Sequence, residues 1–290
     1  MRAFRGHGTY VYRVPDIIAH YGSLGRAVQA MRNAGMHHAW VRIHGKSTYD
    51  AEEKDLIAAF IASLKAGGLS VAGWGWCQGL DPIGEANLAL RELSHFGLED
   101  YVADIEEGVH QSHWEAVDIV QFCQTVRASL SGGFGITTFP LIDWHAPDLM
   151  KAALPFVDMF NPQVYWFRYP DEKMVSQFKL PNAKPYGLDS PTEYARLCLD
   201  RWNALMGATR KGLVLTGQVY WNESNRPFSK SESEEKLAEF IDGWSEFTRV
   251  VGLNWWHFCG QTAMSQEQLD TITNARLDSK DFATFPISEL

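Results

Sequence analysis

The sequence has only four cysteines in 290 residues, and none of them belongs to a CxxC pair. A zinc ribbon or a disulfide scaffold needs cysteines at close and repeated spacings, so both are excluded as the organising principle of this chain. Isolated cysteines in a protein of this size behave as small apolar side chains. We therefore expect all four to be free, buried thiols: Cys77, Cys123, Cys198 and Cys259.

Long apolar runs are also missing. No stretch approaches the roughly 20 apolar residues that a membrane helix needs. The N-terminal segment MRAFRGHGTYVYRVPD has no apolar core followed by a small-residue cleavage site, so it does not resemble a signal peptide. We expect a cytoplasmic protein without membrane insertion, which some other route would deliver to the cell wall if its substrate lies there.

Clustered positive charge and phosphate-binding loops are absent as well. The formal net charge of −9 disfavours nucleic acid and anionic membranes as partners, because both are bound chiefly through groups of Lys and Arg. Neither GxGxxG nor GxxxxGK[ST] occurs, so nothing indicates a nucleotide site. We expect no cofactor, and the sequence does not predict an oligomeric state.

Strand-like apolar runs are what the sequence has in abundance. Eight recur through the chain, each followed by a stretch that is compatible with a helix. Their ranges are 9–14, 38–44, 69–76, 100–106, 133–139, 157–166, 212–221 and 251–258.

Helical periodicity fills most of the intervals, as in AEEKDLIAAFIASLKAGG and GEANLALRELSHFG. Eight strand–helix repeats without an obvious linker predict an α/β fold, a single (β/α)8 TIM barrel that spans residues 1–290. A doubly wound open sheet is the alternative, but it normally carries a glycine-rich phosphate turn. The longer connection at about 167–211 is expected to form a loop over the cleft before its helix.

Polar and aromatic side chains gather at the predicted carboxyl ends of the strands, where a TIM barrel builds its site. Flat aromatic rings interleaved with amides and carboxylates suit a sugar, whose apolar face stacks and whose hydroxyls need hydrogen-bond partners. The predicted substrate-binding residues are Arg42, His44, Trp74, Trp76, Gln163, Tyr165, Gln218, Tyr220, Trp255 and Trp256.

The segment YVADIEEG supplies the predicted catalytic pair, Asp104 and Glu106. Alternation along a strand puts both on one face, about 7 Å apart at the backbone. Two such carboxyl groups raise each other's pKa, and burial raises it further, so one can stay protonated and act as a general acid. Glu106, nearer the open end, is the predicted acid. In the alternative, Asp104 forms an ion pair with Arg42 inside the barrel, and Glu106 is a solvated rim residue. In either case Glu107 should point away from this face of the strand.

The chain resembles the glycosidase barrels of the family 25 lysozymes and, more distantly, the family 18 chitinases. Both carry Asp-x-Glu at the end of strand four, matched here by Asp104 to Glu106. NPQVYW is similar to the chitinase motif on strand six, at Gln163 and Tyr165, and GLNWWHF offers Trp255 or Trp256 as the floor of the sugar site. Family 25 lysozymes also carry an aspartate after strand one, where this chain has only Asp16.

Two questions stay open at the level of the sequence. A second carboxylate across the cleft could come from Asp143 or Glu223; otherwise an N-acetyl group of the substrate could act as the nucleophile, as the resemblance to chitinases implies. His110 and His113 form an HxxH spacing, so a metal-dependent hydrolase or deacetylase is an alternative, although no metal site is predicted. His37 and His38 are expected at the surface, at the opposite end of the barrel.

The resulting hypothesis is a glycoside hydrolase of lysozyme or endolysin type that acts on an N-acetylated polysaccharide, with peptidoglycan favoured over chitin. The alternative from another class is a non-catalytic carbohydrate-binding barrel, in which the aromatic rings and amides only recognise the sugar.

Overall fold

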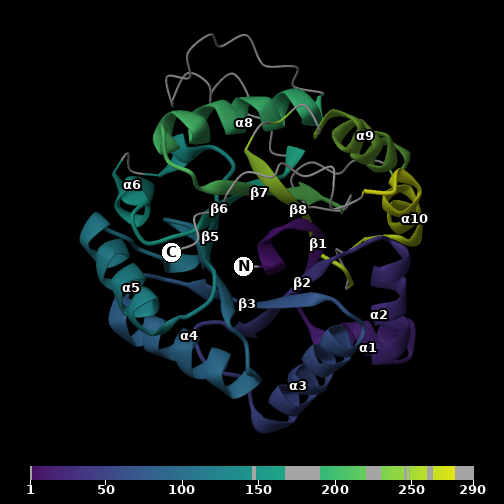
Figure 1. Cartoon of the computed structure of the whole chain (residues 1–290), viewed down its shortest axis with the longest axis horizontal. Coiled ribbons are helices and arrows are strands. Elements are labelled where there is room, and N and C mark those ends of the chain that lie inside the picture. Colours follow the sequence, from purple (N-terminus) through teal and green to yellow (C-terminus); the bar gives the residue numbers. More distant parts are fainter. Residues whose placement is uncertain are drawn as a thin grey trace.

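The chain folds into a closed parallel barrel of eight strands in sequential order, β1 to β8, surrounded by helices (Figure 1). This computed structural model describes residues 2–145, 148–166, 190–219, 230–244, 247, 249–259 and 264–277. The predicted TIM barrel is confirmed. Its strands are β1 Gly6–Val11, β2 His38–His44, β3 Ser70–Cys77, β4 Asp100–Ile105, β5 Phe134–Thr138, β6 Met159–Val164, β7 Gly212–Gln218 and β8 Val250–Trp256.

Helices follow the strands and form the outer ring of the barrel (Figure 1). The α-helices are α1 Val14–Tyr21, α2 Leu24–Asn33, α3 Ala51–Ala66, α4 Pro82–Phe96, α5 Ala116–Ser129, α6 Leu149–Ala153, α8 Pro191–Met206, α9 Lys230–Gly243 and α10 Gln266–Ala275. Side-chain caps fix several of their starts, for example Asp50, which accepts a hydrogen bond from the Glu53 amide at the start of α3. No helix in the described ranges is long and apolar enough to cross a membrane.

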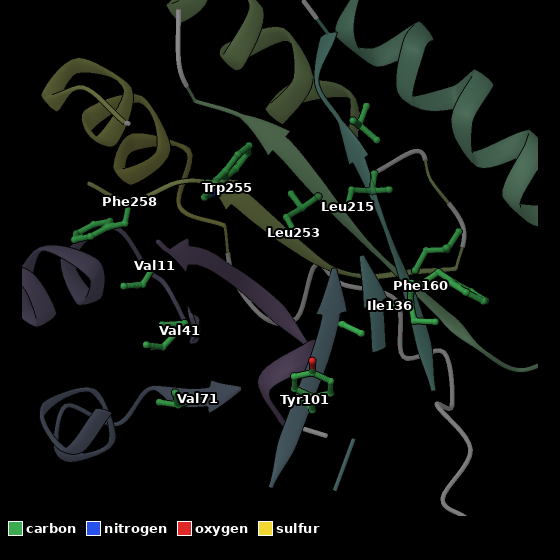
Figure 2. Packing of buried hydrophobic residues seen from close by; sticks show 14 of the residues in the cluster. Val11, Val41, Val71, Tyr101, Ile136, Phe160, Leu215, Leu253, Trp255 and Phe258 are labelled. Atoms are coloured by element: carbon green, nitrogen blue, oxygen red, sulfur yellow. The ribbon is translucent and has the colours of Figure 1, made fainter. Parts of the chain in front are cut away.

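Alternation along the strands separates two apolar layers. One set of side chains points outward and packs under the helices, including Val41, Tyr101 and Leu253 (Figure 2). The other set fills the barrel interior, where Tyr10, Trp40, Trp74, Val102 and Met159 pack together. All four cysteines are free and buried, as predicted.

The amino end of the barrel is closed by the chain itself. The short 3-10 helix η1 (Arg2–Phe4) lies across the centre of the ring (Figure 1), and the Trp40 indole donates to the Ala3 carbonyl at 2.7 Å. His38 lies in the same region, fully buried, with its ring 2.9 Å from the Asn254 amide oxygen. The expectation that His38 is a surface residue is therefore wrong, because it belongs to the inward face of β2.

Several predicted strands run past the carboxyl ends of the observed ones. The first was expected over 9–14, but β1 ends at Val11 and α1 begins at Val14, with Pro15 in its first turn. The strands predicted over 157–166 and 212–221 end at Val164 and Gln218. Within the connection expected at 167–211, α8 occupies Pro191–Met206, and 167–189 lie outside the described residues.

Candidate active site

A cavity of about 400 Å³ opens at the carboxyl ends of β1 to β4 and β8. It brings together six of the residues predicted from the sequence: Arg42, Trp74, Trp76, Asp104, Glu106 and Trp256. Three further side chains complete its lining: Tyr12, Lys46 and His110. Tyr12 and Lys46 were not predicted: Tyr12 falls inside the range 9–14 expected for the first strand, and Lys46 lies two residues beyond the end of β2.

Asp104 is the buried member of the acid pair. It points inward from β4, opposite Trp76 in the register with β3, and is 8% exposed. Burial and the nearby Glu106 carboxylate raise the pKa of Asp104 well above its ordinary value, while the Arg42 charge and a hydrogen bond from Gln163 lower it. A carboxyl group in this position keeps a proton to higher pH than a solvated aspartate does.

Glu106 follows the last residue of β4 and is partly exposed at the cavity mouth. The loop after it is tied back, because the Ser112 hydroxyl donates to the Glu106 carbonyl. Glu107 points elsewhere, as expected, and accepts a hydrogen bond from the Trp114 amide. Glu106 is thus the carboxyl group of this pair with direct access to a ligand.

A polar layer lies beneath the acid pair inside the barrel. Gln163 Nε2 donates to Asp104 Oδ1 at 3.1 Å and lies 3.4 Å from the Thr137 hydroxyl. Two residues earlier on β6, Asn161 accepts hydrogen bonds at its Oδ1 from the Tyr10 and Thr216 hydroxyls, each at 2.8 Å. The bonds to Asn161 satisfy buried polar groups, and the contacts of Gln163 with Asp104 and Thr137 hold the amide beneath the acid pair.

Aromatic rings form one wall of the cavity. The Tyr12 ring stacks on Trp74 with centroids 6.3 Å apart, and Trp256 packs edge-on against Trp74 at 5.6 Å. Trp76 lies above this group, with its ring 5.9 Å from His110. Such a wall offers an apolar surface beside two carboxyl groups, which is the combination that a sugar ring requires.

Two cations lie over this aromatic wall. The Arg42 guanidinium carbon is 4.8 Å from the centre of the Tyr12 ring and 5.5 Å from that of Trp74. The Lys46 ammonium lies 5.4 Å from the centre of Trp76. Arg42 influences Asp104 through its charge, but the ion pair considered as an alternative from the sequence is not formed between these two side chains.

His44 does not reach the cavity, contrary to the expectation from alternation. The register of β2 against β3 shifts between Arg42 and His44, so that an extra residue turns the histidine outward. Its ring is buried at 1% exposure and lies 2.9 Å from the Tyr101 hydroxyl in the layer under the helices. Burial lowers the pKa of His44 to about 4, as expected for a neutral packing residue.

The two adjacent tryptophans of β8 point in opposite directions. Trp256 lines the cavity, whereas Trp255 is fully buried in the outer layer, where Figure 2 shows it beside Leu253. The Trp255 indole donates to His7, and its ring packs edge-on against Phe240. Of the two rings offered by GLNWWHF, the structure therefore brings only Trp256 to the cavity.

Two further predicted binding residues, Tyr165 and Gln218, lie at the ends of β6 and β7. Gln218 is buried at the end of β7, on the inward face that carries Thr216, and Tyr165 is buried just after β6. Neither lines the cavity described above. Tyr220 lies outside the described residues.

No carboxylate faces the acid pair among the described residues that line the cavity. Asp143 is engaged elsewhere, since Arg201 Nε on α8 donates to it at 2.7 Å. Asp16 lies on α1 and Glu223 lies outside the described residues. In the described part of the chain no three His, Cys, Asp or Glu side chains gather to hold a metal ion; His113 instead contacts Glu107 at 3.4 Å.

No protein-family model matches the chain, and no curated protein matches its sequence. Solved structures do resemble it. A GH5_18 protein from Bifidobacterium longum subsp. infantis has a TM-score of 0.63 at 10% identity, covering 98% of this chain and 80% of that one. A GH113 beta-1,4-mannanase also has a TM-score of 0.63 at 10% identity, with coverage of 95% and 99%.

A GH18 chitinase from Flavobacterium johnsoniae has a TM-score of 0.57 at 11% identity and covers 94% of each chain. At such low identity these likenesses establish the fold and not the activity. The chain is therefore similar in its whole architecture to the TIM barrels of glycoside hydrolases.

Proposed function

We propose that this protein is a glycoside hydrolase that cleaves an N-acetylated polysaccharide, with peptidoglycan as the favoured substrate and Glu106 as the general acid. The observation that carries the proposal is the carboxyl pair of Asp104 and Glu106 beside an aromatic wall at the carboxyl end of a TIM barrel. Active sites of this fold lie at that end of the barrel. The similar structures named above, a mannanase and a chitinase among them, support polysaccharide cleavage.

The two carboxyl groups would titrate as one unit. Because Asp104 is buried and lies near a second acid, the pair retains one proton to higher pH than two separate carboxyl groups would. Glu106, at the mouth, would pass that proton to the glycosidic oxygen as the bond from the anomeric carbon breaks. Gln163 would then stabilise the Asp104 carboxylate through its hydrogen bond, while the two adjacent negative charges would favour the return of a proton to Glu106.

Attack of a nucleophile on the anomeric carbon is the second chemical step that we propose. No described carboxylate lines the cavity opposite the pair, so the acetamido oxygen of the substrate would attack the anomeric carbon and form a cyclic intermediate. Water would then open this intermediate and give its proton to the Glu106 carboxylate, which restores the acid. An N-acetylated sugar is therefore favoured over the neutral glucans and mannans, which have no acetamido group.

The test is the release of reducing ends from a panel of purified polysaccharides: peptidoglycan, chitin, beta-1,4-mannan and beta-1,3-glucan. The proposal expects cleavage of peptidoglycan, or of chitin as the second choice, and formation of a product that retains the anomeric configuration. Cleavage confined to mannan or glucan would contradict the N-acetyl step, and no cleavage of any of them would contradict the glycosidase itself.

A further inference from the structure

We propose that Arg42 and Lys46 form an anion subsite beside the acid pair, so that the preferred substrate carries a carboxylated sugar unit. This inference rests on the proposed function, because it specifies the substrate class of the same cavity. Both cations, Arg42 and Lys46, line the cavity together with the acid pair.

The side chains that line the cavity change from cationic to aromatic to acidic from one strand to the next around the barrel. Arg42 and Lys46 come from β2 and the residues after it, Trp74 and Trp76 from β3, and the acids from β4 and its end. Strands two steps apart are separated by about 10 Å, twice the usual spacing between neighbours. A sugar that stacks on the partly exposed Trp76 would therefore meet cations on one side and the acid pair on the other.

Within the described residues, the Arg42 side chain donates a hydrogen bond from its Nε to the His44 carbonyl at 3.3 Å. Its guanidinium also lies over the faces of Tyr12 and Trp74. Within the described part of the chain, neither Arg42 nor Lys46 has a carboxylate within ion-pair distance. A guanidinium group presents paired N–H donors that match the two oxygens of a carboxylate, and partial burial strengthens such a contact.

The backbone makes room for this guanidinium. A Cβ atom added at Gly45 would lie 2.8 Å from Arg42 Nη2, so any side chain there would displace the group. Gly45 does not have a positive φ, which means that the backbone conformation does not require glycine. We infer that the glycine serves the position of Arg42, and that Gly45→Ala is a mild way to move the cation without removing it.

The anion could come from either of two sources. One is the lactyl carboxylate of a muramic acid unit that carries no stem peptide, and the other is a uronate in an N-acetylated polysaccharide. Both present the same planar group to the guanidinium. The experiment therefore uses one tetrasaccharide of each kind, each with its neutral methyl ester as the matched control.

Dissociation constants are measured by calorimetry with Glu106→Gln, so that nothing is cleaved, at low and at high salt. At least one carboxylated tetrasaccharide should bind tenfold or more tightly than its ester, with a preference that salt weakens. In the same background, Arg42→Met should remove the preference and Gly45→Ala should reduce it. Lys46→Met should have a smaller effect, because this exposed ammonium is more strongly screened.

The inference would be overturned if both acids bound no more tightly than their esters, or if neither acid bound at all. It would also be overturned if the preference for the acid survived Arg42→Met. Cleavage by the unaltered chain is measured separately. If it cleaves acid and ester forms equally, the glycosidase proposal stands and the anion subsite falls. If it binds the acids selectively but cleaves nothing, the subsite stands and the glycosidase proposal falls.

Discussion

Gln163 on β6 donates a hydrogen bond to Asp104 on β4 across the barrel interior, over 3.1 Å between Nε2 and Oδ1. The bond joins the strand-six motif to the acid pair and stabilises the ionised form of the aspartate. It is the most direct structural link between the two sequence motifs on which the functional hypothesis depends.

Replacing Gln163 with Leu should therefore raise the pKa of the acid pair. The ionised form of Asp104 loses a donor, so the proton is held to higher pH and the corresponding limb of the pH–rate profile moves upward. The profile of kcat/KM on the cleaved polysaccharide measures this. The control is Gln121→Leu on the exposed face of α5, which should leave the profile unchanged; a downward shift for Gln163→Leu would contradict the assignment.

Replacing Trp76 with Ala should weaken substrate binding with little loss of stability. Trp76 is only partly buried, and its ring forms the upper part of the aromatic wall. Loss of one stacking surface is expected to raise KM roughly 5- to 20-fold. Trp76→Phe should retain most of the affinity, whereas an unchanged KM for the alanine variant would mean that the sugar does not stack there. Thermal unfolding of both variants checks that the fold is intact.

The protein should lose stability steadily as the pH falls below neutrality. Burial lowers the pKa of His7 to about 3 and those of His38, His44 and His145 to about 4. Above about pH 6.5, the ordinary pKa of histidine, these rings are neutral in both the folded and the unfolded state, so they do not change the free energy of unfolding. Below it the unfolded chain takes up protons that the folded chain refuses, so the free energy of unfolding falls until the folded pKa values are reached.

Urea unfolding between pH 7.5 and pH 4.5 measures this dependence. Each such histidine steepens the slope by up to about 1.4 kcal/mol per pH unit. His44→Gln should make the dependence shallower, whereas His95→Gln, which removes an exposed histidine from the end of α4, should leave it unchanged. Stability that is constant or rising toward pH 4.5 would contradict the buried, neutral state of these rings.

The fold was predictable because period-two apolar runs and period-3.6 helical patterns alternate along the whole chain, and the observed β2 coincides with the predicted range 38–44. The acid pair was predictable for the same reason, since Asp104 and Glu106 end a strand with an unambiguous pattern. Strand ends were less predictable: the apolar run TYVYRV extends to residue 14, although Pro15 in the first turn marks the start of α1 at Val14.

The side to which a residue points was harder to predict wherever the alternation breaks. The bulge at the end of β2 turns His44 outward, and the sequence HAWVRIH contains no sign of it. Trp255 and Trp256 could be separated only once the register of β8 was known. Lys46 reaches the cavity from two residues beyond β2, where alternation no longer applies, whereas Tyr12 continues the inward alternation of Tyr10 just past the end of β1.

The most direct test of the account is the effect of Glu106→Gln on cleavage and on binding of the same polysaccharide. The account predicts a loss of kcat by a factor of about 10² to 10⁴ with affinity retained, because the substitution removes the acid but keeps the shape of the side chain. Glu99→Gln, an exposed glutamate before the other end of β4, is the matched control and should cleave normally. A Glu106→Gln variant with nearly full kcat, or an unaltered chain that cleaves no polysaccharide, would contradict the central claim.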